Sequence, residues 1–107
     1  MDMEIIYNKL IRDNIPEIIK NGGGIPFTRV LGDEEFLNAL NAKLSEEVAE
    51  YLESGLVSEL WDILEVVYAI AKAKGFSKED LELGRREKSA ANGGFEKKLL
   101  LEKIVGD

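Results

Sequence analysis

Two short acidic segments contain the residues of this chain that are best suited to chemistry. Glu46-Glu47-Val48-Ala49-Glu50 is followed, after a gap of eight residues, by Glu59-Leu60-Trp61-Asp62. Acids spaced by three or four residues lie on one face of a helix, where like charges repel by about 0.2–0.5 kcal/mol per exposed pair. A cation bound between two such helices would remove that repulsion. Mg²⁺ is the expected cation, because it prefers oxygen ligands and shares them with substrate phosphates.

The absence of two residue types excludes several mechanisms. The chain has no Cys and no His, so it has no disulfide framework, no thiolate or imidazole ligand, and no Ser-His or Cys-His nucleophile. Any catalysis must use carboxylates, Lys or Arg, hydroxyls or a metal. There is also no apolar run of about 18 residues and no signal-peptide pattern at the start, so we expect no membrane span and a cytoplasmic protein.

The charge is unevenly distributed. The formal net charge is −7, but residues 33–65 contain ten acids and one base, Lys43, for a local net charge of −9. The remainder of the chain has a net charge of +2. Such an acidic chain is a poor non-specific binder of nucleic-acid polymers. A small phosphorylated ligand that arrives with its own Mg²⁺ is compatible with this distribution.

The length and pattern predict a single all-α domain over residues 1–107. With 45% apolar residues the chain can fill a modest core. Gly, Pro and capping residues delimit the helices. The predicted helices are 13–20, 33–54, 58–74 and 77–92, the last beginning with a Ser77-Asp80 capping box. Residues 25–31 are expected to be extended, and 95–104 could form a strand or a helix, so both ends include short extended segments.

The two central helices each carry an apolar stripe, and a short connection ending at Gly55 should make them an antiparallel hairpin. The stripe residues are Leu37, Leu40, Leu44, Val48 and Tyr51 on the first, and Leu60, Leu64, Val67 and Ala71, widened by Ile63 and Ile70, on the second. Further apolar residues (Trp61, Val66 and Tyr68) lie away from the stripe, which is compatible with self-association.

The predicted hairpin brings the acids together. It places Glu50 near Glu59 and sets Glu47 opposite Asp62. At about 100° per residue, Glu47 lies roughly 70° from the centre of its stripe, at the core boundary, whereas Glu46 points toward solvent. A partly buried cluster of this kind requires raised pKa values or a counter-charge. The alternative is a solvated acidic helix face, which runs of charge usually form.

The pattern Glu-Glu-x-x-Glu followed by Glu-x-x-Asp resembles the metal site of the all-α nucleoside triphosphate pyrophosphohydrolases. That superfamily includes MazG, the dimeric dUTPases and phosphoribosyl-ATP pyrophosphohydrolase. Residues 43–50 and 59–64 are similar to the two halves of its signature, and 8–16 and 92–95 resemble the small MazG-related subgroup. Two features depart from the family pattern: the gap between Glu50 and Glu59 is short, and Asn92 stands where a basic residue is expected.

The resemblance implies a reaction and its residues. The family cleaves between the α- and β-phosphates of a nucleoside triphosphate or of phosphoribosyl-ATP, releasing pyrophosphate. The implied Mg²⁺ ligands are Glu47, Glu50, Glu59 and Asp62, with Mn²⁺ as a possible substitute, and the implied catalytic acids are Glu46, Glu47 and Glu50. A metal-activated water would attack phosphorus, and Glu46 or Glu50 would orient it. The family also implies a homodimer whose paired hairpins form a four-helix core, or a larger oligomer.

Phosphates beyond the metal require cations, and five bases outside the acidic block are candidates for substrate binding. They are Lys9, Arg12, Lys88, Lys97 and Lys98. Gly93-Gly94 could present backbone N–H groups to a phosphate, and Trp61 and Tyr68 could stack on a base. Each also has an ordinary interpretation as a surface base, a helix end or a core aromatic. Two other functions remain open: a non-catalytic helical interaction module with an acidic face, and a metal-binding protein without hydrolase activity.

Overall fold

The computed structural model describes residues 3–106, which form four α-helices and no strand. The helices are α1 (Ile15–Asn21), α2 (Asp33–Ser54), α3 (Val57–Ala73) and α4 (Lys78–Asn92). The all-α prediction is confirmed, the bounds of α2 are those predicted, and the other helices begin within two residues of their expected starts. Residues 25–31 and 95–104 have no regular secondary structure.

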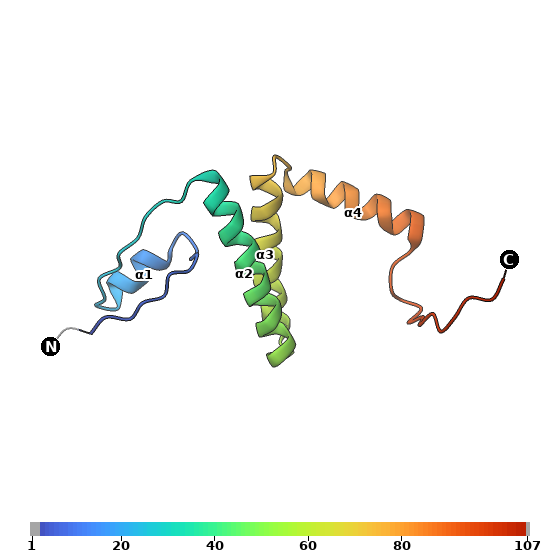
Figure 1. Cartoon of the computed structure of the whole chain (residues 1–107), viewed down its shortest axis with the longest axis horizontal. Helices are drawn as coiled ribbons and strands as arrows, with labels where there is room; N and C mark the ends of the chain where they lie inside the picture. The colour runs from blue at the N-terminus through green and yellow to red at the C-terminus, as the bar shows by residue number, and fades with distance from the viewer. Residues whose placement is uncertain (1–2, 107) are drawn as a thin grey trace.

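An antiparallel hairpin of α2 and α3 is the centre of the molecule (Figure 1). Only Gly55 and Leu56 connect the two helices. Gly55 has a φ of +67°, in the left-handed region, and its N–H donates to the Tyr51 carbonyl oxygen at 2.8 Å. Glycine adopts this conformation without the cost that a Cβ imposes, so the chain can reverse direction immediately after α2.

The hairpin core is small. Its buried apolar residues are Leu40 on α2 and Val66 and Ala71 on α3. The expectation that Val66 lies off the core face is wrong, and Leu60 and Leu64 of the predicted stripe are 37% and 48% exposed. The physical reason is that α3 is apolar over a wide arc. One side of this arc packs on α2, and the other faces an open groove beside α4.

The fourth helix leaves the hairpin at the far end of α3 (Figure 1). The predicted capping box is present: Ser77 Oγ accepts from the Asp80 N–H at 3.0 Å, and Asp80 Oδ2 accepts from the Ser77 N–H at 2.9 Å. These two bonds satisfy N–H groups that the start of a helix otherwise leaves unpaired. The cap therefore fixes where α4 begins after the turn at Gly75.

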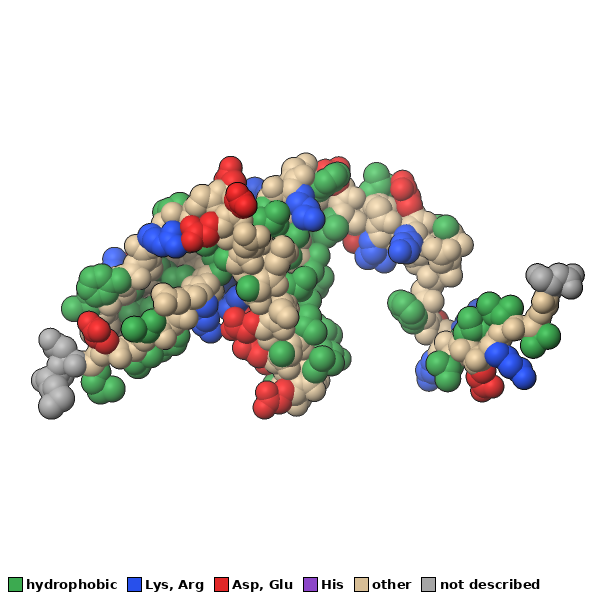
Figure 2. Space-filling model, in the orientation of Figure 1, with side chains coloured by type: hydrophobic (Ala, Val, Ile, Leu, Met, Phe, Trp, Pro, Cys, Tyr) green, Lys and Arg blue, Asp and Glu red, His purple; other side chains and the backbone are tan. Residues whose placement is uncertain are grey.

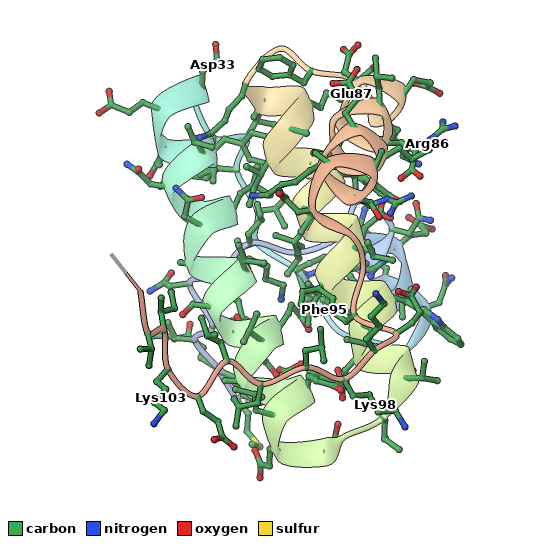
Figure 3. The ribbon with its side chains drawn as sticks, turned by 90° about the vertical axis from the view of Figure 1, so that its right-hand side faces the viewer. Asp33, Arg86, Glu87, Phe95, Lys98 and Lys103 are labelled. Carbon is green, nitrogen blue, oxygen red and sulfur yellow. The ribbon has the colours of Figure 1, made fainter. Side chains whose placement is uncertain are left out.

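A single copy of the chain is elongated. Its radius of gyration is 19.2 Å, against about 13 Å for a compact domain of this length. The segment with α1 lies on one side of the hairpin, and α4 with the C-terminal tail lies on the other (Figures 1 and 3). Large apolar side chains remain exposed over the hairpin and the tail (Figure 2), including Phe95 at 97%. One copy therefore leaves much of its apolar surface uncovered.

The part of the chain that the structure describes contains no candidate membrane-spanning helix. None of the helices within residues 3–106 has both the length and the apolar character that crossing a bilayer requires.

The left-handed turn that closes the hairpin gives a first testable prediction. We expect Gly55→Ala to lower the free energy of unfolding by about 1 kcal/mol, because a Cβ is unfavourable at this φ. A Cβ at Gly55 meets no atom within 4 Å, so the cost is conformational and not a clash. Urea unfolding at fixed protein concentration measures the change.

The matched control for this turn is Gly84→Ala in the interior of α4. A Cβ at Gly84 also meets nothing within 4 Å, but its φ is not positive. This substitution should stabilise the protein by about 0.5–1 kcal/mol, because alanine is the better helix former. Equal effects of the two substitutions would contradict the account of the turn.

Candidate metal site

Three carboxylates converge across the hairpin. Glu47 and Glu50 lie one turn apart on α2, and Glu59 lies in the first turn of α3. Each places a carboxylate oxygen within 4.8 Å of the other two. The short connection at Gly55 produces this approach, because it brings the first turn of α3 alongside the last turns of α2. Glu50 thus lies near Glu59, as the hairpin geometry predicts.

Glu47 is the most constrained member of this group. It is only 7% exposed, which agrees with its predicted place at the core boundary. Its Oε1 lies 3.4 Å from Lys43 Nζ, whereas Oε2 is buried and has no hydrogen-bond partner among the described residues. Burial, together with the neighbouring Glu50 carboxylate, raises the pKa of Glu47, and Lys43 opposes this shift. A buried oxygen without a donor is costly, so this site favours an additional positive partner.

The three carboxylates suit a hard divalent cation. Two oxygens bound to one Mg²⁺ at about 2.1 Å are at most about 4.2 Å apart. The three carboxylate oxygens lie within 4.8 Å of one another, so binding one ion would draw them closer together. The partnerless Glu47 oxygen supplies a ligand that no described residue uses. Glu47, Glu50 and Glu59 would hold the ion, and their oxygens match the donors that Mg²⁺ or Mn²⁺ prefers.

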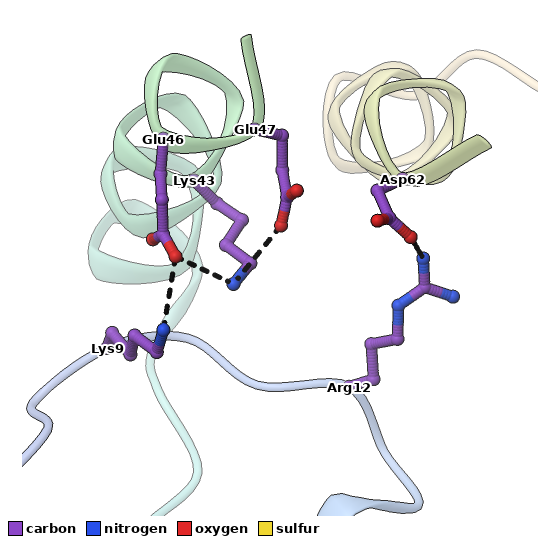
Figure 4. A network of polar contacts seen from close by, with 6 residues as sticks. All are labelled: Lys9, Arg12, Lys43, Glu46, Glu47 and Asp62. Carbon is purple, nitrogen blue, oxygen red and sulfur yellow. Dashed lines mark hydrogen bonds and ion pairs between the residues drawn. The ribbon is translucent and has the colours of Figure 1, made fainter. Parts of the chain in front are cut away.

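Asp62, the fourth predicted ligand, is not part of this group. Its Oδ1 accepts a hydrogen bond from Arg12 Nη2 at 2.7 Å (Figure 4). Arg12 belongs to the segment before α1, fifty residues earlier in the chain. The structure thus brings together three of the four predicted ligands and pairs the last one with a cation.

Glu46 contacts two lysines. Its Oε1 accepts from Lys9 Nζ at 3.1 Å and from Lys43 Nζ at 3.5 Å (Figure 4). Glu46 lies outside the three-carboxylate group, as its place on the solvated side of α2 predicts, but it is half-buried because the N-terminal segment crosses this face. The hydrogen bond from Lys9, assisted by the charge of Lys43, lowers the pKa of Glu46. The bond to Glu46 raises the pKa of Lys9, and the charges of Glu50 and Glu47 add to that effect.

Lys43, the one base of the acidic block, is a site residue that is not among the predicted ligands. It bridges Glu46 and Glu47, at 3.5 and 3.4 Å, from one turn earlier on α2. The signal was present in its spacing of three and four residues from these acids. Lys9 and Arg12 were predicted as phosphate ligands, and the structure places both beside the acids. Their pairing partners could not be read from local spacing.

The other predicted phosphate ligands lie elsewhere. Lys88 is on α4, and Lys97 and Lys98 are on the tail, all exposed and on the opposite side of the hairpin from the N-terminal segment (Figures 1 and 3). The structure does not bring them to the acids within one copy. Gly93 ends α4, and its N–H donates to the Ser89 carbonyl oxygen at 2.7 Å.

The two aromatic residues considered for base stacking have different surroundings. Lys78 Nζ lies 5.0 Å from the centroid of the Tyr68 ring, a cation–π distance. Trp61 is 65% exposed on α3. Tyr68 therefore already has a partner, whereas the Trp61 ring is accessible to a ligand.

Comparison with known proteins identifies one partial relative. The chain is 55% identical over 42 residues to an uncharacterized protein of Mycolicibacterium smegmatis (strain ATCC 700084 / mc(2)155), an alignment that covers 39% of this chain and 43% of that protein. No protein-family model matches the chain. No solved structure matches it significantly.

The raised pKa of Glu47 gives a second testable prediction, for metal-free protein in EDTA. Near pH 4 Glu47 is largely protonated in both the folded and the unfolded state, so its ionisation contributes little to the free energy of unfolding. As the pH rises through the usual carboxylate range, the unfolded chain ionises more readily than the folded one, so wild-type stability falls. Glu47→Gln removes this contribution, and its stability relative to wild type should rise between about pH 4 and pH 7.

Urea unfolding at each pH measures that difference. Glu53→Gln, which removes an exposed carboxylate from the same helix, is the control for the loss of one charge. A Glu47→Gln difference that stays constant or shrinks as the pH rises would show that burial of Glu47 does not raise its pKa.

Proposed function

We propose that this protein is a Mg²⁺-dependent nucleotide pyrophosphohydrolase. It cleaves the α–β phosphate bond of a nucleoside triphosphate or a phosphoribosyl-ATP-like substrate and releases pyrophosphate. The observation that carries the proposal is the buried, partnerless Glu47 oxygen beside Glu50 and Glu59. The resemblance of the two acidic segments to the all-α pyrophosphohydrolase signature supplies the reaction. A cytoplasmic location is part of the same proposal.

The roles of the acids follow from their surroundings. The chemistry that bound Mg²⁺ supplies is charge neutralisation at the phosphates and a more acidic water. Glu47, Glu50 and Glu59 would hold the ion in position. Glu46 is engaged by two lysines and has a lowered pKa, which makes it a poor proton acceptor. Glu50 is exposed, so water reaches it, and it is the better candidate to orient the attacking water.

The bases of the N-terminal segment are the first candidates to bind a phosphate. Lys9 and Arg12 both lie at the edge of the acidic group. The planar guanidinium of Arg12 can donate two parallel hydrogen bonds to a phosphate, which gives orientation as well as charge. Lys88, Lys97 and Lys98 can reach such a phosphate only from a second copy, because they lie across the hairpin from their own acids (Figures 1 and 3).

Association of two copies is the second part of the proposal. An open groove of about 700 Å³ separates α3 from α4. Its lining is largely apolar, with contributions from Leu44, Leu64, Val67, Ile70, Phe76 and Leu81. A second hairpin is the occupant we propose, because the radius of gyration of 19.2 Å is far above the value for a compact chain. Pairing two hairpins would form a four-helix core and cover the outer side of α3.

The enzymatic proposal predicts pyrophosphate release. Purified protein with Mg²⁺ should release pyrophosphate from at least one member of a broad panel of nucleotides. Glu47→Gln and Asp62→Asn should each lower the rate by about 100-fold or more, because they remove charge that the phosphoryl transition state requires. Product identification by ³¹P NMR separates cleavage at the α–β bond from loss of a terminal phosphate.

Glu53→Gln is the matched control, since it removes an exposed carboxylate from the same helix. It should retain activity, and all three variants should keep the helical circular dichroism of wild type. Metal binding without turnover on the whole panel would favour a metal-binding protein. Absence of both metal binding and turnover would favour the helical interaction module.

The association proposal predicts a mass of about twice 11.9 kDa by light scattering. Leu64→Glu should weaken the dimer by at least about tenfold, because it places a charge in the apolar groove. Asn41→Glu adds the same charge to an exposed polar position on α2 and should leave the mass unchanged. A monomer at all accessible concentrations would refute the pairing of hairpins.

A further inference from the structure

The segment before α1 spans the acidic face of the hairpin. Lys9 Nζ donates to Glu46 Oε1 at 3.1 Å, and Arg12 Nη2 donates to Asp62 Oδ1 at 2.7 Å (Figure 4). The first bond reaches α2 and the second reaches α3. One short segment is therefore tied to both helices of the hairpin, at the end where the three-carboxylate group lies.

These two ties are weak enough to be exchanged. The side chains of Lys9 and Glu46 are 45% and 32% exposed, and those of Arg12 and Asp62 are 55% and 41% exposed. Ion pairs this accessible to water typically contribute only about 0–1 kcal/mol each. The adjoining helix α1 has no buried residue that would anchor the segment. Leu10 and Ile11, between the two bases, are half-buried, so the segment is docked by apolar side chains as well as by charge.

The two bases of the segment that contact the hairpin acids carry the same positive charge as one divalent cation. Lys9 and Arg12 together bring two positive charges to an acidic block whose own net charge is −9 over residues 33–65. Lys9 interacts with the metal-binding acids as well as with its direct partner, since Glu50 and Glu47 both act on it. A divalent ion among Glu47, Glu50 and Glu59 would neutralise the same acids and repel both side chains.

Arg12 has a second effect on the metal site. It engages the carboxylate that the sequence pattern offers as a fourth ligand, and Asp62 is the predicted acid that is absent from the group within 4.8 Å. Three carboxylates leave an ion with fewer protein ligands than four. Release of Asp62 would provide the fourth, and the same event would free the Arg12 guanidinium.

We propose that the Arg12–Asp62 ion pair is an exchangeable counter-ion contact: a divalent cation displaces Arg12 from Asp62, Asp62 turns to the cation, and Arg12 becomes available to a phosphate. This inference rests on the proposed metal site. Without substrate the N-terminal segment and the cation compete for the acids. By linkage, weaker docking of the segment means tighter cation binding. A bound phosphate gives Arg12 a new partner, so the cation and the phosphate would then bind cooperatively.

Calorimetric titration of the full chain with MgCl₂ alone tests the exchange without relying on activity. Arg12→Gln should bind Mg²⁺ at least about threefold more tightly than wild type, because the competitor is gone. Arg29→Gln is the matched control. It also removes one arginine from an ion pair, with Glu35 at 2.6 Å, but at the start of α2 and away from the three-carboxylate group. Its Mg²⁺ affinity should equal that of wild type.

The Asp62→Asn background separates exchange from simple repulsion. If Arg12 acts mainly by holding Asp62, adding Arg12→Gln to Asp62→Asn should give a smaller gain in Mg²⁺ affinity than adding it to wild type. An equal gain in both backgrounds would overturn the exchange, and so would equal affinities of wild type and Arg12→Gln, while both leave the metal site intact. If neither protein binds Mg²⁺, the proposed function fails and this inference fails with it.

Mobility of the segment provides a second readout in protein that retains the ion pair. The chain has no cysteine, so a nitroxide on Tyr7→Cys labels one position, and Tyr7 is already 66% exposed. Saturating Mg²⁺, which is diamagnetic, should narrow the spin-label spectrum as the segment is released. The same label should be mobile without Mg²⁺ when Arg12→Gln is added. A spectrum that does not change with Mg²⁺ in a protein that binds it would refute displacement.

Discussion

Burial of one carboxylate with too little positive charge is the constraint on which this structure depends. Glu47 is 7% exposed, and one of its oxygens has no partner in the described part of the chain. Such a group costs stability unless a cation is present, so its place at the hairpin interface favours a cation site. A solvated acidic face would not bury one of its members. For this reason we favour a cation site over a solvated acidic helix face.

The remaining charges can be understood as partial compensation for that burial. Lys43 reaches Glu46 and Glu47 from within α2, and Lys9 and Arg12 arrive from a distant segment (Figure 4). None of them donates to the free oxygen of Glu47. The N-terminal part of this compensation is also accessible to water. A site that must admit a metal and a phosphate needs counter-charges that can leave, and exposed ion pairs have this property.

The elongated shape has a similar cause. The outer side of α3 and the tail after α4 carry apolar side chains for which a single copy provides no cover (Figure 2). Among residues 3–106, only three apolar residues are buried, which is a very small core for a chain of this length. Stability at this size comes mainly from buried apolar area, so a partner surface would add what the monomer lacks. A second copy would also explain why basic residues are positioned on α4 and the tail, away from the acids of their own chain.

Much of the fold could be predicted locally. The helices follow from apolar spacing and from Gly, Pro and Ser at their ends, and the short link at Gly55 requires the antiparallel hairpin that brings Glu50 near Glu59. The sequence by itself also determined that only oxygen ligands are available, because Cys and His are absent. Only the tertiary structure decided which side of α3 packs on α2, since its apolar arc allows more than one orientation. It also decided that Lys9 and Arg12 engage Glu46 and Asp62. These contacts join residues 37 and 50 positions apart, and periodicity within one helix carries no information about such pairs.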